Sequence, residues 1–126
     1  MQNINFDWMR GDDEREVLLV EQGVAPFDLT GYRADLHIRP EEGSPVELST
    51  GNGLNIENHQ ITIEIAHEKT KNAEWRAASW DLQLTSPEGR VKTICGGIVR
   101  LHEVRHELQD RHHRESGRKK AADRAA

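Results

Sequence analysis

The sequence predicts an all-β fold, an immunoglobulin-like antiparallel β-sandwich, and three observations lead to this prediction. Between residues 32 and 39 apolar and polar residues alternate without a break, which is typical of a strand with one buried face. Turn signals containing Gly, Pro, Asn or Asp recur every eight to fifteen residues. No stretch shows the apolar period of a long amphipathic helix, which βαβ crossovers would require.

The other elements follow from the same alternation. Apolar or alternating runs predict strands over residues 3–8, 17–21, 32–39, 46–49, 54–56, 61–65, 78–85 and 90–101. Asn58-His59 separates two of these runs as a hairpin turn. Residues 67–72 break the alternation and predict a short helical turn that crosses from one sheet to the other. Gly96-Gly97 shifts the phase of the last strand by one residue, which predicts a β-bulge.

The chain divides into a β-sandwich domain over residues 1–101 and a charged, His/Arg-rich extension over residues 102–126. The 126 residues are 35% hydrophobic with a mean hydropathy of -0.80. These values are low, but the apolar residues are concentrated in periodic runs and can therefore build one core. In the extension only Val104 and Leu108 form an apolar pair at helical spacing, so we expect a flexible or helical tail.

Charge is distributed unevenly between the two parts. Residues 1–101 carry 10 basic and 17 acidic side chains, whereas residues 102–126 carry 7 basic and 5 acidic ones. Such an acidic body is unsuited to neutralising phosphates, so we expect it to bind no nucleic acid. The cations at 118–120 and 124 could touch phosphates, but no aromatic is interleaved for base stacking, and a solvated tail or one that orders on a neighbouring subunit is expected.

Targeting signals and cysteine usage indicate the compartment. The first residues lack a charged segment followed by an apolar one, and no run of about 18 apolar residues occurs, so we expect neither Sec export nor a membrane span. Cys95 is the only cysteine, which rules out an internal disulfide and favours a reducing compartment. We expect Cys95 to be a small core residue, because no base lies near it in the sequence.

The sharpest chemical motif is His102-Glu103-Val104-Arg105-His106, which matches H-E-x-x-H. On a helix, two histidines at this spacing can bind one zinc ion while the glutamate polarises a zinc-bound water. This arrangement is typical of a zinc hydrolase. Here the motif continues a strand instead, and the residues left to supply a third ligand are few, Asp110, His112 and Glu115. We therefore expect no catalytic, cofactor-binding or metal-binding residues.

The remaining motifs are interpreted as structural. Arg10-Gly11-Asp12 spells an adhesion tripeptide, but it is expected to be an ordinary turn. Asp28 is expected to accept backbone hydrogen bonds in a turn, with Thr30 assisting. His37, His59 and His67 are scattered and are expected to be solvated. The three tryptophans, Trp8, Trp75 and Trp80, could form a sugar-stacking platform if two of them were exposed together. Trp8 and Trp80 are in phase with inward residues, so we expect them in the core.

The order of these signals resembles a group of small tailed-bacteriophage virion proteins that are similar to the N-terminal domain of baseplate upper proteins. The resemblance spans roughly residues 3–101 and departs from the group at Pro26-Phe27-Asp28, at Trp80, where Tyr is commoner, and in the tail. The segments that carry it are Arg10-Gly11-Asp12, 26–32, Ile38-Arg39, Gly51-Asn52-Gly53, 61–65, Trp80-Asp81-Leu82 and 89–97.

This resemblance implies a non-enzymatic structural or adaptor protein of a phage tail, baseplate or neck, without cofactors. Its implied partners are other virion proteins and copies of itself, and its implied location is the virion, after synthesis in the bacterial cytoplasm. The alternative function is a module of the particle that binds a host-surface glycan or protein. A zinc hydrolase using His102, Glu103 and His106 is the third possibility.

Overall fold

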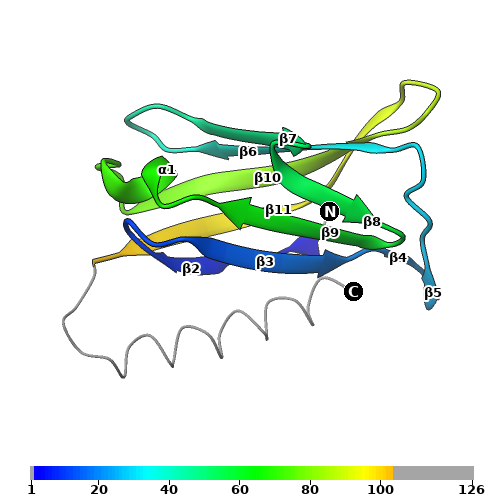
Figure 1. Ribbon diagram of the computed structural model, residues 1–126, viewed down its shortest axis with the longest axis horizontal. Coiled ribbons are helices and arrows are strands. Elements are labelled where there is room, and N and C mark those ends of the chain that lie inside the picture. The colour runs from blue at the N-terminus through cyan, green and yellow to red at the C-terminus, as the bar shows by residue number, and fades with distance from the viewer. Residues whose placement is uncertain (1, 104–126) are drawn as a thin grey trace.

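A single curled sheet dominates the computed structural model, which describes residues 2–103 (Figure 1). Its strands follow the order β1-β11-β10-β6-β7-β8-β9-β3, and β2 pairs with β11 beside β1. A two-stranded ribbon, β4-β5, stands apart from it. The strands are β1 (Gln2–Asn3), β2 (Phe6–Met9), β3 (Glu14–Leu19), β4 (Glu21–Gln22), β5 (Ala25–Pro26), β6 (Arg33–Arg39), β7 (Val46–Thr50), β8 (Gly53–Glu57), β9 (Gln60–Ile65), β10 (Ala77–Thr85) and β11 (Val91–His102), and the helix is α1 (Glu68–Lys71).

The all-β prediction is confirmed, and the helix α1 lies inside the predicted helical turn at 67–72. It does not cross between two sheets as predicted, because β9 and β10 on either side of it belong to the same sheet. The immunoglobulin-like subdivision into two sheets is not confirmed, because the ladder hydrogen bonds join nine strands into one open sheet. Most neighbours are antiparallel as expected, but β1 and β2 run parallel to β11, and β7 pairs in parallel with β8. The predicted boundary at residue 101 falls one residue before the end of β11, and the tail from residue 104 lies outside the described residues.

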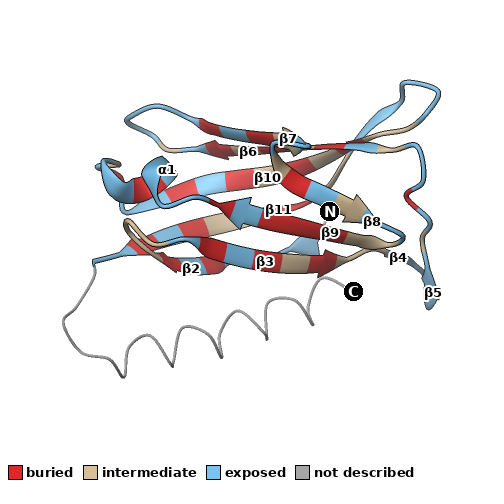
Figure 2. Cartoon of the chain, viewed as in Figure 1, coloured by how far each residue is buried: buried red, intermediate tan, exposed pale blue. Residues whose placement is uncertain are grey.

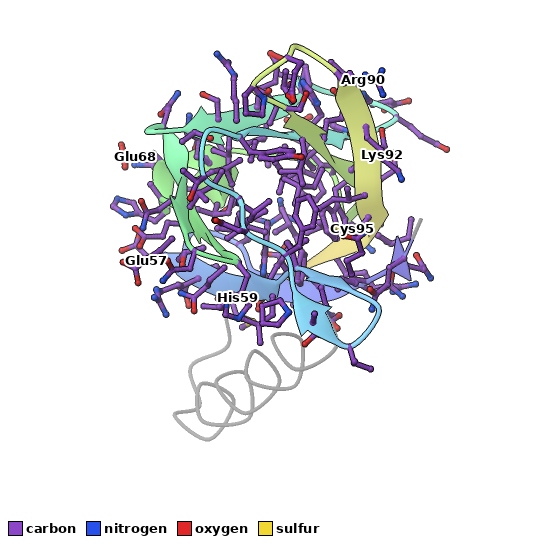
Figure 3. All side chains as sticks on the ribbon, turned by 90° about the vertical axis from the view of Figure 1, so that its right-hand side faces the viewer. Glu57, His59, Glu68, Arg90, Lys92 and Cys95 are labelled. Atoms are coloured by element: carbon purple, nitrogen blue, oxygen red, sulfur yellow. The ribbon has the colours of Figure 1, made fainter. Side chains whose placement is uncertain are left out.

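The core fills the inside of the curl. Inward residues alternate with outward ones along β6 and β10, as the two-residue period of a strand requires (Figure 2). Phe6 stacks on Trp8 and on Trp80, with ring centroids 5.4 Å and 4.9 Å apart. The Trp80 indole also donates a hydrogen bond to the carbonyl oxygen of Ile4 (2.9 Å), which ties the first residues of the chain to the sheet. In the end-on view, side chains occupy the interior (Figure 3).

Side chains join the two edges of the open sheet near the turn between β2 and β3. The buried carboxylate of Glu16 accepts a hydrogen bond from the Trp8 indole (3.0 Å), and Glu14 accepts one from the backbone N–H of Met9 (2.9 Å). Glu14 and Glu16 occupy inward positions of β3, in phase with Leu18. The predicted strand at 17–21 therefore began too late, because its first inward residues are carboxylates that an apolar pattern does not detect.

The predicted bulge at Gly96-Gly97 is wrong in its position. Gly96 and Gly97 pair in regular register with Asp81 and Trp80, and the register shift falls between Leu82 and Gln83, so that Ile94 is the extra residue on β11. The two glycines instead permit close backbone approach. A Cβ on Gly96 would lie 2.6 Å from the carbonyl oxygen of Trp80, and one on Gly97 would lie 1.9 Å from that of Ile4.

Candidate functional site

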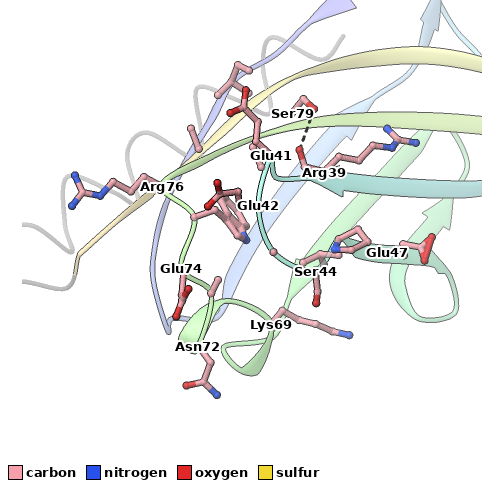
Figure 4. Close-up of a pocket in the computed structure, with 18 of the residues that line it drawn as sticks. Arg39, Glu41, Glu42, Ser44, Glu47, Lys69, Asn72, Glu74, Arg76 and Ser79 are labelled. Atoms are coloured by element: carbon pink, nitrogen blue, oxygen red, sulfur yellow. Dashed lines mark hydrogen bonds between the residues drawn. The ribbon is translucent and has the colours of Figure 1, made fainter.

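A groove of about 1000 Å³ lies at one end of the sheet (Figure 4). Its walls are the loop that follows β6, helix α1 and the segment that leads into β10. Buried Trp75 and the partly buried Ile98 contribute apolar surface to it. Five glutamates line it, Glu41, Glu42, Glu47, Glu68 and Glu74, against three cations, Arg39, Lys69 and Arg76. We call this hollow the acidic groove.

Local backbone chemistry places the walls of the acidic groove. Pro40 cannot donate to the ladder, so β6 ends at Arg39 and the chain turns outward. Gly43 has a φ of 106°, a backbone conformation that residues with a side chain rarely adopt, and a Cβ added at this position would lie 3.9 Å from Cδ1 of Trp75. The opposite wall is held by Arg10, whose guanidinium donates hydrogen bonds to the carbonyl oxygens of Ala73 and Trp75. Both walls are therefore anchored to the body of the sheet.

A row of charged side chains on the outer sheet face continues the groove. Strand register places Asp81 of β10, His37 of β6 and Glu47 of β7 side by side. His37 Nδ1 lies 3.7 Å from Asp81 Oδ1, and His37 Nε2 lies 3.6 Å from Glu47 Oε2. Arg39 forms an ion pair with the other oxygen of Asp81. Because Arg39 and Glu47 also line the acidic groove, the row and the groove form one polar surface.

The chemistry of this surface would suit a basic ligand. Its carboxylates outnumber its cations, and Arg39 is already paired with Asp81. Exposed ion pairs contribute little individually, but several of them beside apolar groove surface give both affinity and selectivity. Among residues 2–103, no group of three or more His, Cys, Asp or Glu side chains is arranged so that it could hold a metal ion.

Only the first two residues of the H-E-x-x-H motif, His102 and Glu103, belong to the described part of the chain. His102 is the last residue of β11, so it lies on a strand and not on a zinc-binding helix, and its Nε2 is 2.9 Å from Asp7 Oδ1. Glu103 Oε1 pairs with Arg10 Nε at 2.9 Å. His106 and the possible third ligands Asp110, His112 and Glu115 lie outside the described residues.

The turn prediction for Arg10-Gly11-Asp12 is confirmed. Gly11 has a φ of 81°, and the Asp12 N–H donates to the carbonyl oxygen of Met9 (3.2 Å). The Gly11 N–H donates to the buried hydroxyl of Thr70 in α1 (2.9 Å). Because Arg10 reaches Ala73, Trp75 and Glu103, the turn fastens the segment before β10 to the end of β11.

Replacing Arg10 with Ala is expected to lower the free energy of unfolding by about 2 kcal/mol, since it leaves two carbonyl oxygens and a carboxylate without their donor. Arg10→Lys should recover only part of this loss, because an ammonium cannot reproduce the guanidinium fork. Denaturant unfolding at constant m-value measures the change. Arg15→Ala is the control, because Arg15 and Glu64 are both exposed and 3.8 Å apart. An equal loss in both variants would contradict the role of Arg10.

Two carboxylates accept hydrogen bonds in turns, as the sequence predicted for Asp28. Asp28 Oδ1 accepts from the N–H (3.0 Å) and the hydroxyl (2.7 Å) of Thr30, and these bonds lower the pKa of Asp28. Asp13 Oδ1 accepts from the N–H (2.7 Å) and ring Nδ1 (2.9 Å) of His67. The backbone hydrogen bond from His67, followed by its ring contact, lowers the pKa of Asp13 below the ordinary value of 3.8. His67 is thus exposed, as expected, but is not independent of the fold.

Lowered folded-state pKa values make part of the stability acid-sensitive. A depressed carboxyl pKa stabilises the fold above the unfolded-state pKa, and this contribution is lost as the pH falls through the lower folded-state pKa. The melting temperature should therefore decrease below about pH 4, near the ordinary pKa of 3.8. Asp13→Asn should melt lower than the wild type at neutral pH and lose less on acidification. Parallel pH profiles for the two proteins would contradict this assignment.

The tryptophans and the cysteine are core residues. Trp8 and Trp80 are buried as predicted, and Trp75 is buried as well, with 8% of its surface exposed, so the three do not form an exposed platform for sugar stacking. Cys95 is buried, also as predicted. Desolvation, with a smaller contribution from the Asp81 carboxylate, raises the pKa of Cys95 to about 12, so its thiol remains protonated at neutral pH.

The acidic groove and the charged row were not predicted from the sequence. His37 was expected to be an isolated solvated residue, yet it stands between two carboxylates contributed by other strands. A strand-pairing assignment could have revealed this row, because cross-strand neighbours follow directly from register. The groove could not have been found in this way, since its walls are irregular segments.

Comparison with known proteins adds no assignment: no protein-family model matches this chain, and no curated protein matches it at a significant level. No helix within residues 2–103 has the length and apolar character needed to cross a lipid bilayer.

Proposed function

We propose that this chain is a non-enzymatic structural or adaptor protein of a tailed-bacteriophage virion, placed in the tail, baseplate or neck. It acts through protein–protein contacts with other virion proteins and with copies of itself, after synthesis in the bacterial cytoplasm. The same proposal includes an immunoglobulin-like classification of the all-β fold.

The observation that carries the proposal is the acidic groove together with the charged row. A groove of about 1000 Å³ with anchored walls and mixed apolar and acidic lining suits a protein segment as ligand. Protein–protein interfaces combine such apolar patches with polar rims. These features support the proposal, because a segment of a neighbouring protein would find both apolar and charged contacts in the groove.

The segments that carry the family resemblance support the proposal because they are structural in this fold. Arg10-Gly11-Asp12 is the turn that holds one groove wall, and Asp28 and Thr30 form the turn before β6. In the Trp80-Asp81-Leu82 segment, Trp80 and Leu82 are core residues, while Asp81 belongs to the charged row. A shared order of such segments is what a shared scaffold would require.

The glycan-binding alternative has no specific support in the described residues, because its stacking platform depended on exposed tryptophans and all three are buried. Binding of a host protein would use the same polar surface as binding of a virion protein. We favour the virion role, since the resemblance concerns particle components.

Particle composition tests the proposal. The protein should sediment with purified phage particles on a density gradient and be identified there by mass spectrometry, in several copies per particle. Loss of the gene should yield particles without a complete tail. Complete, infectious particles that lack this protein would overturn the proposal.

A groove variant tests whether the polar surface makes the assembly contact. Glu42→Lys/Glu74→Lys inverts charge in the acidic groove and should reduce incorporation into particles at least tenfold. The matched control, Glu57→Lys/Glu88→Lys, makes the same charge change at exposed positions that do not line the groove, and should be incorporated normally. Equal incorporation of both variants would exclude the groove as the contact.

A further inference from the structure

We propose that the acidic groove binds the basic C-terminal segment of its own chain, residues 104–126. The proposal concerns the isolated protein, so it does not depend on the virion assignment. It rests on the lining of the groove, on the charge of the segment and on the place where the described chain ends.

The lining of the groove suits a basic segment that also carries apolar residues. Its five glutamates face three cations, one of which, Arg39, is held by Asp81. Glu42 and Glu74 come from the two walls, the loop after β6 and the segment before β10 (Figure 4). Between these acidic walls, Trp75 and Ile98 supply apolar surface. A ligand with both cations and a few apolar side chains matches this lining.

The segment has the complementary composition. Residues 104–126 contain seven Arg or Lys and four Asp or Glu, whereas residues 1–103 contain ten basic and eighteen acidic side chains. The densest cationic run is Arg118-Lys119-Lys120, and Val104 and Leu108 are the large apolar residues. Attraction between opposite charges of this kind orients a segment and is weakened by salt.

The described chain ends beside the groove. Leu101, His102 and Glu103 line a smaller hollow of about 470 Å³, and Arg76 and Ala77 line both this hollow and the acidic groove. The ion pair between Arg10 and Glu103 holds the chain end there. Fourteen residues lie between residue 103 and the cationic run, and at random-coil dimensions a chain of that length spans about 20 Å on average.

A second copy carries the same segment, but the segment of the same chain has the advantage of being tethered. A short flexible tether gives an effective concentration in the millimolar range, which exceeds the concentration of free copies in dilute solution. We therefore assign the groove to the segment of its own chain. Occupation by a neighbour's segment is the alternative that the experiment below can detect.

Carbodiimide cross-linking of the dilute full-length protein tests the contact. The reagent joins a lysine amine to a carboxylate in direct contact, with loss of water as an amide forms. We expect links from Lys119 or Lys120 to Glu41, Glu42 or Glu74 in protein that migrates as a monomer, and at least a fivefold decrease of these links in high salt. Links in dimers only would assign the groove to a second copy. Links concentrated on Glu57 or Glu88 would overturn the groove assignment.

Amide chemical shifts of the full-length protein provide an independent readout. Arg118→Gln/Lys119→Gln/Lys120→Gln should shift the amides of Gly43, Glu74 and Ala77, which belong to the groove. The control, Arg90→Gln/Lys92→Gln, removes cations from the side of the molecule opposite Glu57 and Glu68, and should leave those three amides unchanged (Figure 3). Unchanged groove amides in the segment variant would contradict the proposal, whether or not the protein assembles into particles.

Discussion

Leu36→Asp and Ile63→Asp are each expected to abolish soluble folding. Leu36 of β6 is 1% exposed and Ile63 of β9 is 0% exposed, and both side chains point into the curl. Removing a core aliphatic side chain alone costs about 2–5 kcal/mol. A buried carboxylate without a partner adds several kcal/mol, and the sum approaches the roughly 5–15 kcal/mol that stabilises a typical domain.

Soluble yield, far-UV circular dichroism and thermal unfolding of the purified proteins measure this effect. Asn55→Asp on β8 is the control, because it places the same carboxylate on the exposed face of the same sheet. Its free energy of unfolding should remain within about 0.5 kcal/mol of the wild type. A folded, cooperative Ile63→Asp protein would show that the inward face of β9 is not part of the core.

Gly97→Ala is expected to produce the second largest effect, a loss of about 3 kcal/mol together with displacement of the first strand. The added Cβ would lie 1.9 Å from the Ile4 carbonyl oxygen and 2.7 Å from the Ile4 carbonyl carbon. Neither atom can move without separating the N-terminal residues from β11, where the Ile4 N–H bonds to the Gly96 oxygen at 2.8 Å. The Trp80 indole would also lose its acceptor on Ile4.

Gly23→Ala is the matched control for this change. No atom lies within 4 Å of a Cβ at Gly23, so the substitution adds only the cost of a φ of 67°, about 1 kcal/mol. Hydrogen exchange at Ile4 and Ile98 should accelerate in Gly97→Ala and remain unchanged in Gly23→Ala. If the two variants lose equal stability, Gly97 is not at a backbone contact.

Much of the fold was predictable from local patterns. The alternation at 32–39 and 61–65 located β6 and β9, because a strand with one buried face requires a two-residue period. The start of β3 was missed for the same reason, since Glu14 and Glu16 occupy inward positions where the pattern expects apolar residues. The sequence pattern assigned the glycine pair on β11 to a bulge. Glycine is needed there for another reason, because the backbones of Trp80 and Ile4 leave no room for a side chain at Gly96 and Gly97.

The candidate site was less predictable than the fold. Its charged row depends on the pairing of β6 with β7 and β10, and its groove depends on Arg10 reaching the segment before β10 across more than sixty positions of sequence. The sharpest chemical motif in the sequence lay elsewhere, at H-E-x-x-H, and its first histidine, His102, ends β11 and contacts Asp7.

The sequence by itself determined that this chain forms strands and which faces of most of them are inward, since side-chain direction along a strand is a local property of the backbone. Only the tertiary structure decided that the strands join into one curled sheet, that carboxylates bridge its edges and that an acidic groove forms at one end. These features arise from contacts between residues far apart in the chain, and no local period specifies which distant partners meet.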